Sequence, residues 1–172
     1  MKTWSIDLAK EAFRFSGAHF LIFPDGSAER LHGHNYRVFV TVECALSEFG
    51  LVIDFNQIKP LVKTLVDELD EHWLIPGEHP ELTCVHKSEA DGAQEGGEYE
   101  VAYRKRRYLA PAAEIIVLPV NNVSVENLAS WIADQLIERF MGKFPDTPLL
   151  GMKVSVEETL GQRGVCHWHA DV

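Results

Sequence analysis

The segment Leu31-His32-Gly33-His34-Asn35-Tyr36 predicts the start of a strand with two inward-facing histidines. The expected fold of this 172-residue chain is built around that strand. Side chains alternate along an extended strand, so His32 and His34 point to the same side. The apolar residues that follow share the parity of the two histidines, which makes that side the buried one. These residues are Tyr36, Val38, Val40, Val42, Cys44 and Leu46, on a strand expected over about residues 35–46.

The upstream segment Phe15-Ser16-Gly17-Ala18-His19 repeats this alternation within a strand expected over about residues 6–20. Phe13, Phe15, Gly17 and His19 have one parity, and the polar Ser16 has the other. Three imidazoles on the inward faces of two neighbouring strands are typical of an open, catalytic zinc site, which keeps a fourth position for water or substrate. Each histidine taken alone would also fit an ordinary core or turn position.

These two motifs resemble the 6-pyruvoyl-tetrahydropterin synthase and 6-carboxy-tetrahydropterin synthase family. The resemblance implies that His19, His32 and His34 bind Zn²⁺ and that a pterin is the substrate. It also implies the tunnelling fold, built from two strand-strand-helix halves. Subunits of that fold join their sheets into an oligomeric barrel, a hexamer by resemblance, with active sites at subunit interfaces.

Two helices are expected from apolar residues spaced at i, i+3, i+4 and i+7. The first follows Asn56 as N-cap, has Pro60 in its first turn and runs to Leu69. The second follows Ser124 as N-cap, and Gly142 and Pro145 end it. Its expected inner stripe is Leu128, Trp131, Ile132, Gln135, Leu136 and Phe140.

A last strand is expected over about residues 150–160, and a hairpin is expected between the helices. The hairpin pairs residues 82–85 with 99–103 inside an insertion at about 81–118. The fold class is therefore α+β, with an antiparallel four-stranded sheet and two helices on one face. No linker suggests a second domain, so residues 1–172 are expected to form one pterin-synthase-like domain.

Composition excludes several classes of protein. A formal net charge of −10 argues against nucleic-acid and anionic-membrane partners, which favour a basic surface. No stretch approaches the roughly 20 apolar residues of a membrane span, and residues 1–10 lack a signal-peptide core. Three widely spaced cysteines give no disulfide framework, so we expect a cytoplasmic protein.

Substrate binding is assigned to Glu158 and Ser124. Met152, Val154, Val156 and Glu158 share the inward parity of the last strand, whereas Lys153, Ser155 and Glu157 face outward. An inward carboxylate needs a donor, and the adjacent N–H and amino groups of a pterin supply two. The resemblance implies the same role for the Glu of Val156-Glu157-Glu158-Thr159, and it places Ser124 in the pterin pocket.

The catalytic residues depart from the best-known family members, which carry a cysteine shortly before His-Gly-His. Here residues 25–31 contain none, and Glu29 stands three residues before His32. This Glu-x-x-His-Gly-His pattern is similar to a branch of the family in which glutamate replaces cysteine. The family's Asp-His pair corresponds to Asp70 and His72, although Glu71 occupies the position where an ungapped match expects histidine.

The resemblance implies a zinc-dependent lyase that cleaves the side chain of 7,8-dihydroneopterin triphosphate to 6-hydroxymethyl-7,8-dihydropterin. Two alternatives stay open: 6-pyruvoyl- or 6-carboxy-tetrahydropterin synthase activity, and a pterin-binding module without chemistry. Cys166-His167-Trp168-His169 is a rival metal-binding group, to which Cys84 and His86 could add ligands. The basic run at residues 104–107 is either a solvated strand end or a phosphate contact.

Overall fold

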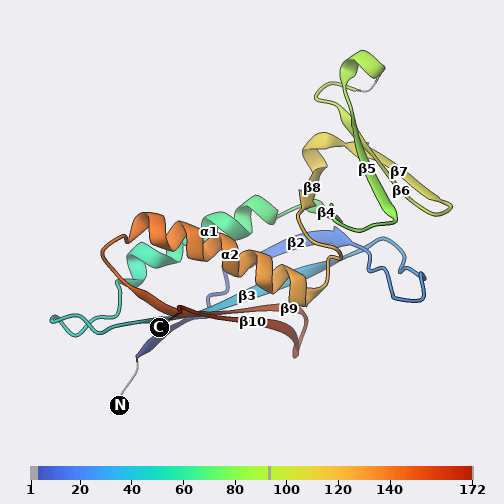
Figure 1. Ribbon diagram of the computed structural model, residues 1–172. Helices are drawn as coiled ribbons and strands as arrows, with labels where there is room; N and C mark the ends of the chain where they lie inside the picture. Colours follow the sequence, from blue (N-terminus) through green and yellow to red (C-terminus); the bar gives the residue numbers. More distant parts are fainter. Residues whose placement is uncertain (1–3, 93, 172) are drawn as a thin grey trace. The chain divides into compact units, whose positions relative to one another are not determined.

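The computed structural model describes residues 4–92 and 94–171 (Figure 1). These residues form two compact units between which the chain passes several times. The first unit contains residues 4–15, 35–70 and 125–171, and the second contains residues 16–34 and 71–124. Strands β2 (Arg14–His19) and β3 (His32–Cys44) contribute residues to both units.

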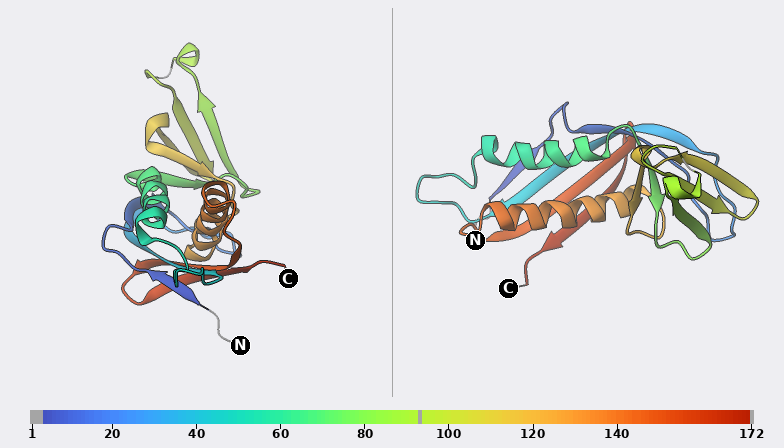
Figure 2. Two further views of the ribbon diagram at one scale, coloured as in Figure 1. Left: turned by 90° about the vertical axis from the view of Figure 1, so that its left-hand side faces the viewer. Right: turned by 90° about the horizontal axis from the view of Figure 1, so that it is seen from above.

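The first unit is an antiparallel sheet with two helices on one face (Figure 2). Strand β3 pairs with β9 (Leu149–Thr159) and with the short β1 (Ser5–Leu8), and β9 pairs with β10 (Gln162–His169). Helices α1 (Phe55–Leu69) and α2 (Val125–Lys143) pack on the sheet. The side chains that meet there are Val40, Val42, Ile58, Val62, Leu136, Phe140 and Met152.

The predicted helices are present, but the start of α1 and the buried face of α2 differ from expectation. Asp54, not Asn56, caps α1, because its carboxylate accepts the Asn56 N–H at 2.8 Å. Pro60 consequently lies in the second turn, where it removes the hydrogen bond to the Asn56 carbonyl. In α2, Trp131 and Gln135 are only half-buried. The buried residues are Leu128, Ala129, Ile132, Ala133, Leu136 and Phe140.

The second unit combines parallel strands with a separate three-stranded sheet. Strand β2 pairs in parallel with β4 (His72–Pro76), which pairs in parallel with β8 (Ile115–Leu118). The antiparallel sheet contains β5 (Leu82–Lys87), β6 (Glu98–Tyr103) and β7 (Arg106–Pro111). A buried cluster forms the core of this unit and includes Phe20, Ile22, Trp73, Ile75, Leu82, Val101, Tyr103 and Ile115.

Two parts of the expected sheet are wrong. The sheet is mixed rather than a four-stranded antiparallel one, because β4 and β8 add parallel pairings. The strand expected over residues 6–20 is two strands, separated by a turn in which the Phe13 N–H donates to the Lys10 carbonyl at 3.0 Å. The predicted hairpin is present, and β7 extends it to three strands.

The outward face of β9 is less exposed than its alternation suggests. Ser155 and Glu157, expected to face solvent, are 6% and 2% exposed. The Glu157 carboxylate accepts hydrogen bonds from Arg163 at 2.6 Å and Arg37 at 3.3 Å. Both guanidinium groups also lie over the Phe39 ring. The hydrogen bond from Arg163 lowers the pKa of Glu157, which explains how a carboxylate is accommodated there.

No helix within the described residues is long and apolar enough to span a bilayer.

Candidate metal centre

The three histidines are held by two strands that approach each other closely. In β2 the buried residues alternate as expected, and His19 at its end is 1% exposed. In β3, His34 is half-buried and His32 is exposed, while their common parity continues into the buried Tyr36. A Cβ on Gly33 would lie 3.2 Å from the Gly17 carbonyl oxygen, so glycine between the histidines permits this approach.

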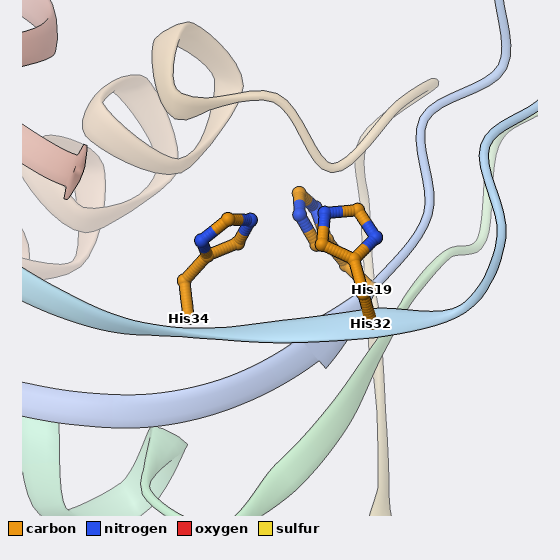
Figure 3. Close-up of side chains that lie close together, drawn as sticks. All are labelled: His19, His32 and His34. Atoms are coloured by element: carbon orange, nitrogen blue, oxygen red, sulfur yellow. The ribbon is translucent and has the colours of Figure 1, made fainter.

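The imidazole rings of His19, His32 and His34 gather on one side of β3 (Figure 3). One nitrogen from each ring lies within 4.8 Å of the others. The ring centroids are 4.8 Å apart for His19 and His32, 5.3 Å for His19 and His34, and 4.8 Å for His32 and His34. Tetrahedral zinc needs ligand nitrogens about 3.3 Å apart, so the three nitrogens would move closer together around a bound ion.

Two of the rings have a defined tautomer. Nδ1 of His19 lies 2.8 Å from the Val123 carbonyl oxygen, and Nδ1 of His32 lies 2.8 Å from the Arg30 carbonyl oxygen. A carbonyl oxygen only accepts, so both Nδ1 atoms carry the proton and both Nε2 atoms carry the lone pair. Backbone carbonyls commonly orient metal-binding histidines in this way. The donor set therefore fits a zinc ion with an open position.

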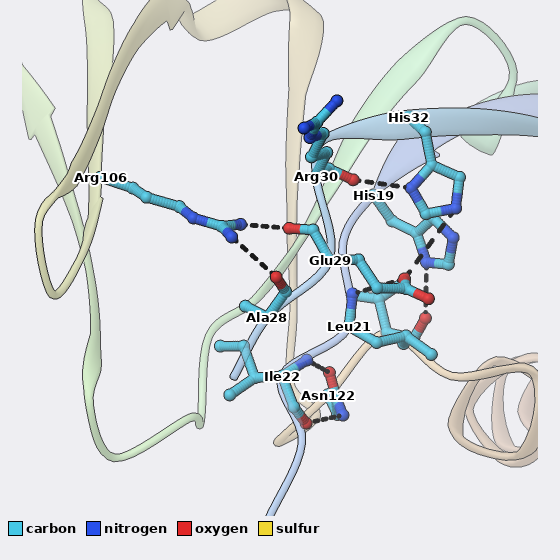
Figure 4. A network of polar contacts seen from close by, with 10 residues as sticks. His19, Leu21, Ile22, Ala28, Glu29, Arg30, His32, Arg106 and Asn122 are labelled. Atoms are coloured by element: carbon cyan, nitrogen blue, oxygen red, sulfur yellow. Dashed lines mark hydrogen bonds and ion pairs between the residues drawn. The ribbon is translucent and has the colours of Figure 1, made fainter. Parts of the chain in front are cut away.

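The residue before Val123, Asn122, is bonded through its side chain to the backbone of Ile22 (Figure 4). The Asn122 side chain accepts the Ile22 N–H at 3.2 Å and donates to the Ile22 carbonyl at 2.9 Å. The side-chain amide of Asn122 thus bonds to both the N–H and the carbonyl of Ile22, as the backbone of a neighbouring strand would. Sequence analysis missed Asn122 and Val123, and the only signal was the Asn121-Asn122 pair before α2.

Glu29 lies beside the histidines, on the loop between β2 and β3. Its Oε2 atom is 3.9 Å from Nε2 of His32 and accepts the Leu21 N–H at 3.1 Å. The side chain is 33% exposed, which leaves it accessible to a bound substrate. A glutamate three residues before His32 is therefore next to the three-histidine group.

The other predicted site residues lie on several elements. Asp70 is the C-cap of α1, and Glu71 adopts φ +59° before His72 begins β4. Backbone pairing places His72 opposite Gly17, two residues from His19. Ser124 directly precedes α2, next to Val123. Glu158 lies half-buried near the end of β9.

The rival metal-binding residues do not form a comparable group. Within residues 4–92 and 94–171, His19, His32 and His34 are the one set of three or more ligands close enough to share an ion. His167 and His169 are exposed on β10. Cys84 lies on β5, where burial raises the pKa of its thiol, and His86 on the same strand is exposed.

The arginines of the basic run have protein partners. Arg104 contacts Glu81 at 3.4 Å, and Arg107 contacts Glu100 at 3.2 Å. Arg106 instead donates to the backbone carbonyls of Ala28 and Glu29. This contact joins β7 to the loop that carries Glu29.

Three histidines on sheet strands, with two tautomers fixed and a carboxylate alongside, form a group that could hold one metal ion. The sequence also matches the 6-pyruvoyl tetrahydropterin synthase family over residues 8–166, and the chain belongs to this family.

Individual relatives agree with this assignment. The putative 6-carboxy-5,6,7,8-tetrahydropterin synthase of Methanocaldococcus jannaschii is 28% identical over 155 residues, covering 90% of this chain and 88% of the relative. A protein of the same name from Pyrococcus abyssi is 31% identical over 127 residues, covering 72% of this chain and 69% of the relative. The 6-pyruvoyl tetrahydropterin synthase structure from Plasmodium falciparum superimposes with a TM-score of 0.87 at 26% identity, covering 99% of this chain and 100% of the other.

Proposed function

We propose that the protein is a zinc-dependent pterin lyase that cleaves the side chain of 7,8-dihydroneopterin triphosphate to give 6-hydroxymethyl-7,8-dihydropterin. One observation carries this proposal. The Glu29 carboxylate lies 3.9 Å from Nε2 of His32, beside the three-histidine group, whereas residues 25–31 contain no cysteine. A glutamate in that place can act as the general base.

His19, His32 and His34 are the residues that would hold the zinc, with His19 and His32 using Nε2. Bound zinc supplies Lewis-acid polarisation of the hydroxyl oxygens of the substrate side chain. Glu158 accepts the N–H and amino groups of the pterin ring, and Ser124 lines the ring's pocket. Asp70 and His72 form a proton relay.

The reaction needs no oxidant. Glu29 removes the proton from the 2′-hydroxyl, the bond between C1′ and C2′ breaks, and C2′ becomes an aldehyde carbon. The bonding electron pair moves to C1′, where conjugation with the pterin ring stabilises it. A proton from the relay then completes the hydroxymethyl group. The products are 6-hydroxymethyl-7,8-dihydropterin and the two-carbon aldehyde that carries the triphosphate.

Two other functions compete with this one. The names of the archaeal relatives favour 6-carboxy-tetrahydropterin synthase activity. A chain of the same fold from Plasmodium vivax has been substituted at a glutamate that acts as a catalytic residue there, which is consistent with glutamate chemistry on this fold. A non-catalytic pterin-binding module would keep Glu158 and the histidines without turnover.

We also propose that the protein works as a homo-oligomer, a hexamer by family resemblance, with active sites at subunit interfaces. The family assignment supports this assembly. Light scattering coupled to size-exclusion chromatography gives the mass directly, and a monomer with full pterin-lyase activity would contradict the proposal.

Product analysis tests the proposed reaction. The zinc-loaded protein is incubated with dihydroneopterin triphosphate under nitrogen, and the oxidised pterins are separated by chromatography. The proposal predicts 6-hydroxymethylpterin as the main product. Exclusive formation of 6-carboxy or 6-pyruvoyl products would establish the synthase alternative, and pterin binding without turnover would favour the binding module.

A further inference from the structure

Glu29 lies at the end of a short hairpin. The Glu29 N–H donates to the Leu21 carbonyl at 3.0 Å, and the Phe23 N–H donates to the Ser27 carbonyl at 2.8 Å. A single bridge pairs Ile22 with Ala28. The hairpin turns at Gly26, whose φ of +79° favours glycine. The Glu29 side chain returns to the opposite strand, where Oε2 accepts the Leu21 N–H.

Two side chains of the β5–β7 sheet, Tyr103 and Arg106, donate hydrogen bonds to this hairpin. The Tyr103 hydroxyl on β6 donates to the Gly26 carbonyl at 2.9 Å. The Arg106 guanidinium on β7 donates to the Ala28 carbonyl at 2.7 Å and also to the Glu29 carbonyl (Figure 4). An arginine suits this task, because its planar fork presents several donors in fixed directions.

The two carbonyls that Arg106 contacts belong to the peptide groups on either side of the Glu29 Cα atom. Restraining both peptide planes restrains φ and ψ of Glu29 together, and therefore the direction in which its side chain leaves the backbone. That direction decides whether the carboxylate reaches the Leu21 N–H and lies beside His32. Positional errors of about 1 Å at a catalytic group can cost about 100-fold in rate.

We infer that Arg106 is a positioning residue for Glu29, so that the inserted β5–β7 sheet sets the geometry of the active-site base. The inference rests on the proposed function for its effect on catalysis. The direction of the Glu29 carboxylate can be measured without an activity assay, because the Leu21 N–H donates to that carboxylate. The sheet thereby acts on the reaction through the backbone of the hairpin that carries Glu29.

Arg106→Met tests this inference, because it keeps a long side chain and removes all donors. The matched control is Arg107→Met, since Arg107 neighbours Arg106 on β7, has a 71% exposed side chain and contacts Glu100 instead. Arg106→Lys keeps the charge but not the planar fork, and Tyr103→Phe removes only the contact to Gly26. Glu29→Ala provides the reference in which the carboxylate bond to Leu21 is absent.

The first readout is amide hydrogen exchange and the ¹⁵N–¹H signal of Leu21. In Arg106→Met we expect Leu21 to exchange about tenfold faster, as expected for loss of a hydrogen bond to a charged group, and its signal to move toward that of Glu29→Ala. Arg106→Lys should give an intermediate change. Arg107→Met should leave Leu21 unchanged.

The second readout is steady-state kinetics with measured zinc content. Arg106→Met should lower kcat about 10- to 100-fold with KM and zinc stoichiometry close to wild type, and Arg106→Lys should restore part of kcat.

An unchanged Leu21 amide in Arg106→Met, or an equal effect of Arg107→Met, would overturn the inference. If wild-type protein turns over no pterin, the proposed function fails and the Leu21 measurement alone decides the positioning role. If Arg106→Met does not fold, Arg106→Lys decides it on the same readouts, because wild-type values for both the Leu21 amide and kcat would overturn the inference.

Discussion

Asn122 offers a test of how the three histidines proposed to bind zinc are oriented. Asn122→Ala removes the two hydrogen bonds to Ile22, at 3.2 Å and 2.9 Å, while leaving all three histidines in place. The neighbouring Val123 carbonyl then loses its anchor. Since this carbonyl accepts the Nδ1–H of His19, the ring becomes less well oriented for a metal.

The expected magnitudes follow from these contacts. Each lost hydrogen bond contributes about 0.5–1.5 kcal/mol, so the free energy of unfolding should fall by about 1–3 kcal/mol. Ile22 is only 7% exposed, which limits rehydration of its backbone and favours the upper half of that range. Loss of a group that orients a metal ligand typically weakens metal affinity about 10- to 100-fold. This corresponds to about 1.4–2.7 kcal/mol in binding free energy.

Zinc affinity is measured by competition with a chromophoric chelator, and stability by urea unfolding of the zinc-free protein. Asn121→Ala is the matched control, because Asn121 is the exposed neighbour of Asn122. It should change zinc affinity less than about twofold, well below the effect on a ligand-orienting group. A destabilised Asn122→Ala protein with wild-type zinc affinity would show that Val123 does not orient His19, which would refute the reasoning.

Three further predictions concern catalysis, acid stability and packing. Glu29→Gln should lower kcat by about 10²- to 10⁴-fold with zinc content and pterin binding retained, and near-wild-type turnover would remove Glu29 from the mechanism. Because Arg163 lowers the pKa of Glu157 below its ordinary 4.5, the folded state binds fewer protons than the unfolded state there. Stability from this pair should be complete above pH 4.5 and lost as the pH falls through the lowered pKa, so urea midpoints should drop less steeply on acidification in Glu157→Gln. Gly164→Ala should cost about 1–3 kcal/mol, because the added Cβ would lie 2.4 Å from the Val125 carbonyl carbon, whereas Gly142→Ala in α2 meets no atom within 4 Å and should be neutral or stabilising by calorimetry.

Local periodicity explains which parts of the structure were predictable. The alternation from Tyr36 to Cys44 and the i, i+3, i+4 spacing from Ile58 to Leu69 both depend on neighbours in sequence, and both predict the buried faces correctly. These two features needed no knowledge of distant contacts, whereas the proximity of His19 to His32 and His34 also requires that β2 and β3 lie side by side.

Long-range pairing explains most of the errors. Strands β4 and β8 are short, and the parallel pairings of β4 with β2 and of β8 with β4 depend on partners far away in sequence. The partner of the His19 ring is Val123, 104 residues later, and Arg106 reaches Glu29 across 77 residues. Neither contact leaves a local sequence pattern.

Glu157 illustrates a limit of alternation itself. Its parity marks it as outward, and it does lie on the face opposite Val156. Arg37 and Arg163 from the flanking strands nevertheless cover it, with Phe39 beneath both guanidinium groups. Period-two alternation identifies a side of the sheet, whereas burial depends also on what the neighbouring strands place there.

The most direct test of the central claim is the zinc content of two variants measured by mass spectrometry of metals after purification and zinc reconstitution. If His19, His32 and His34 form the zinc site, wild-type protein should hold one zinc per chain and His32→Ala should lose it. The double variant His167→Ala/His169→Ala, which alters exposed residues of β10, should retain it. Zinc retained in His32→Ala and lost from the double variant would contradict the account.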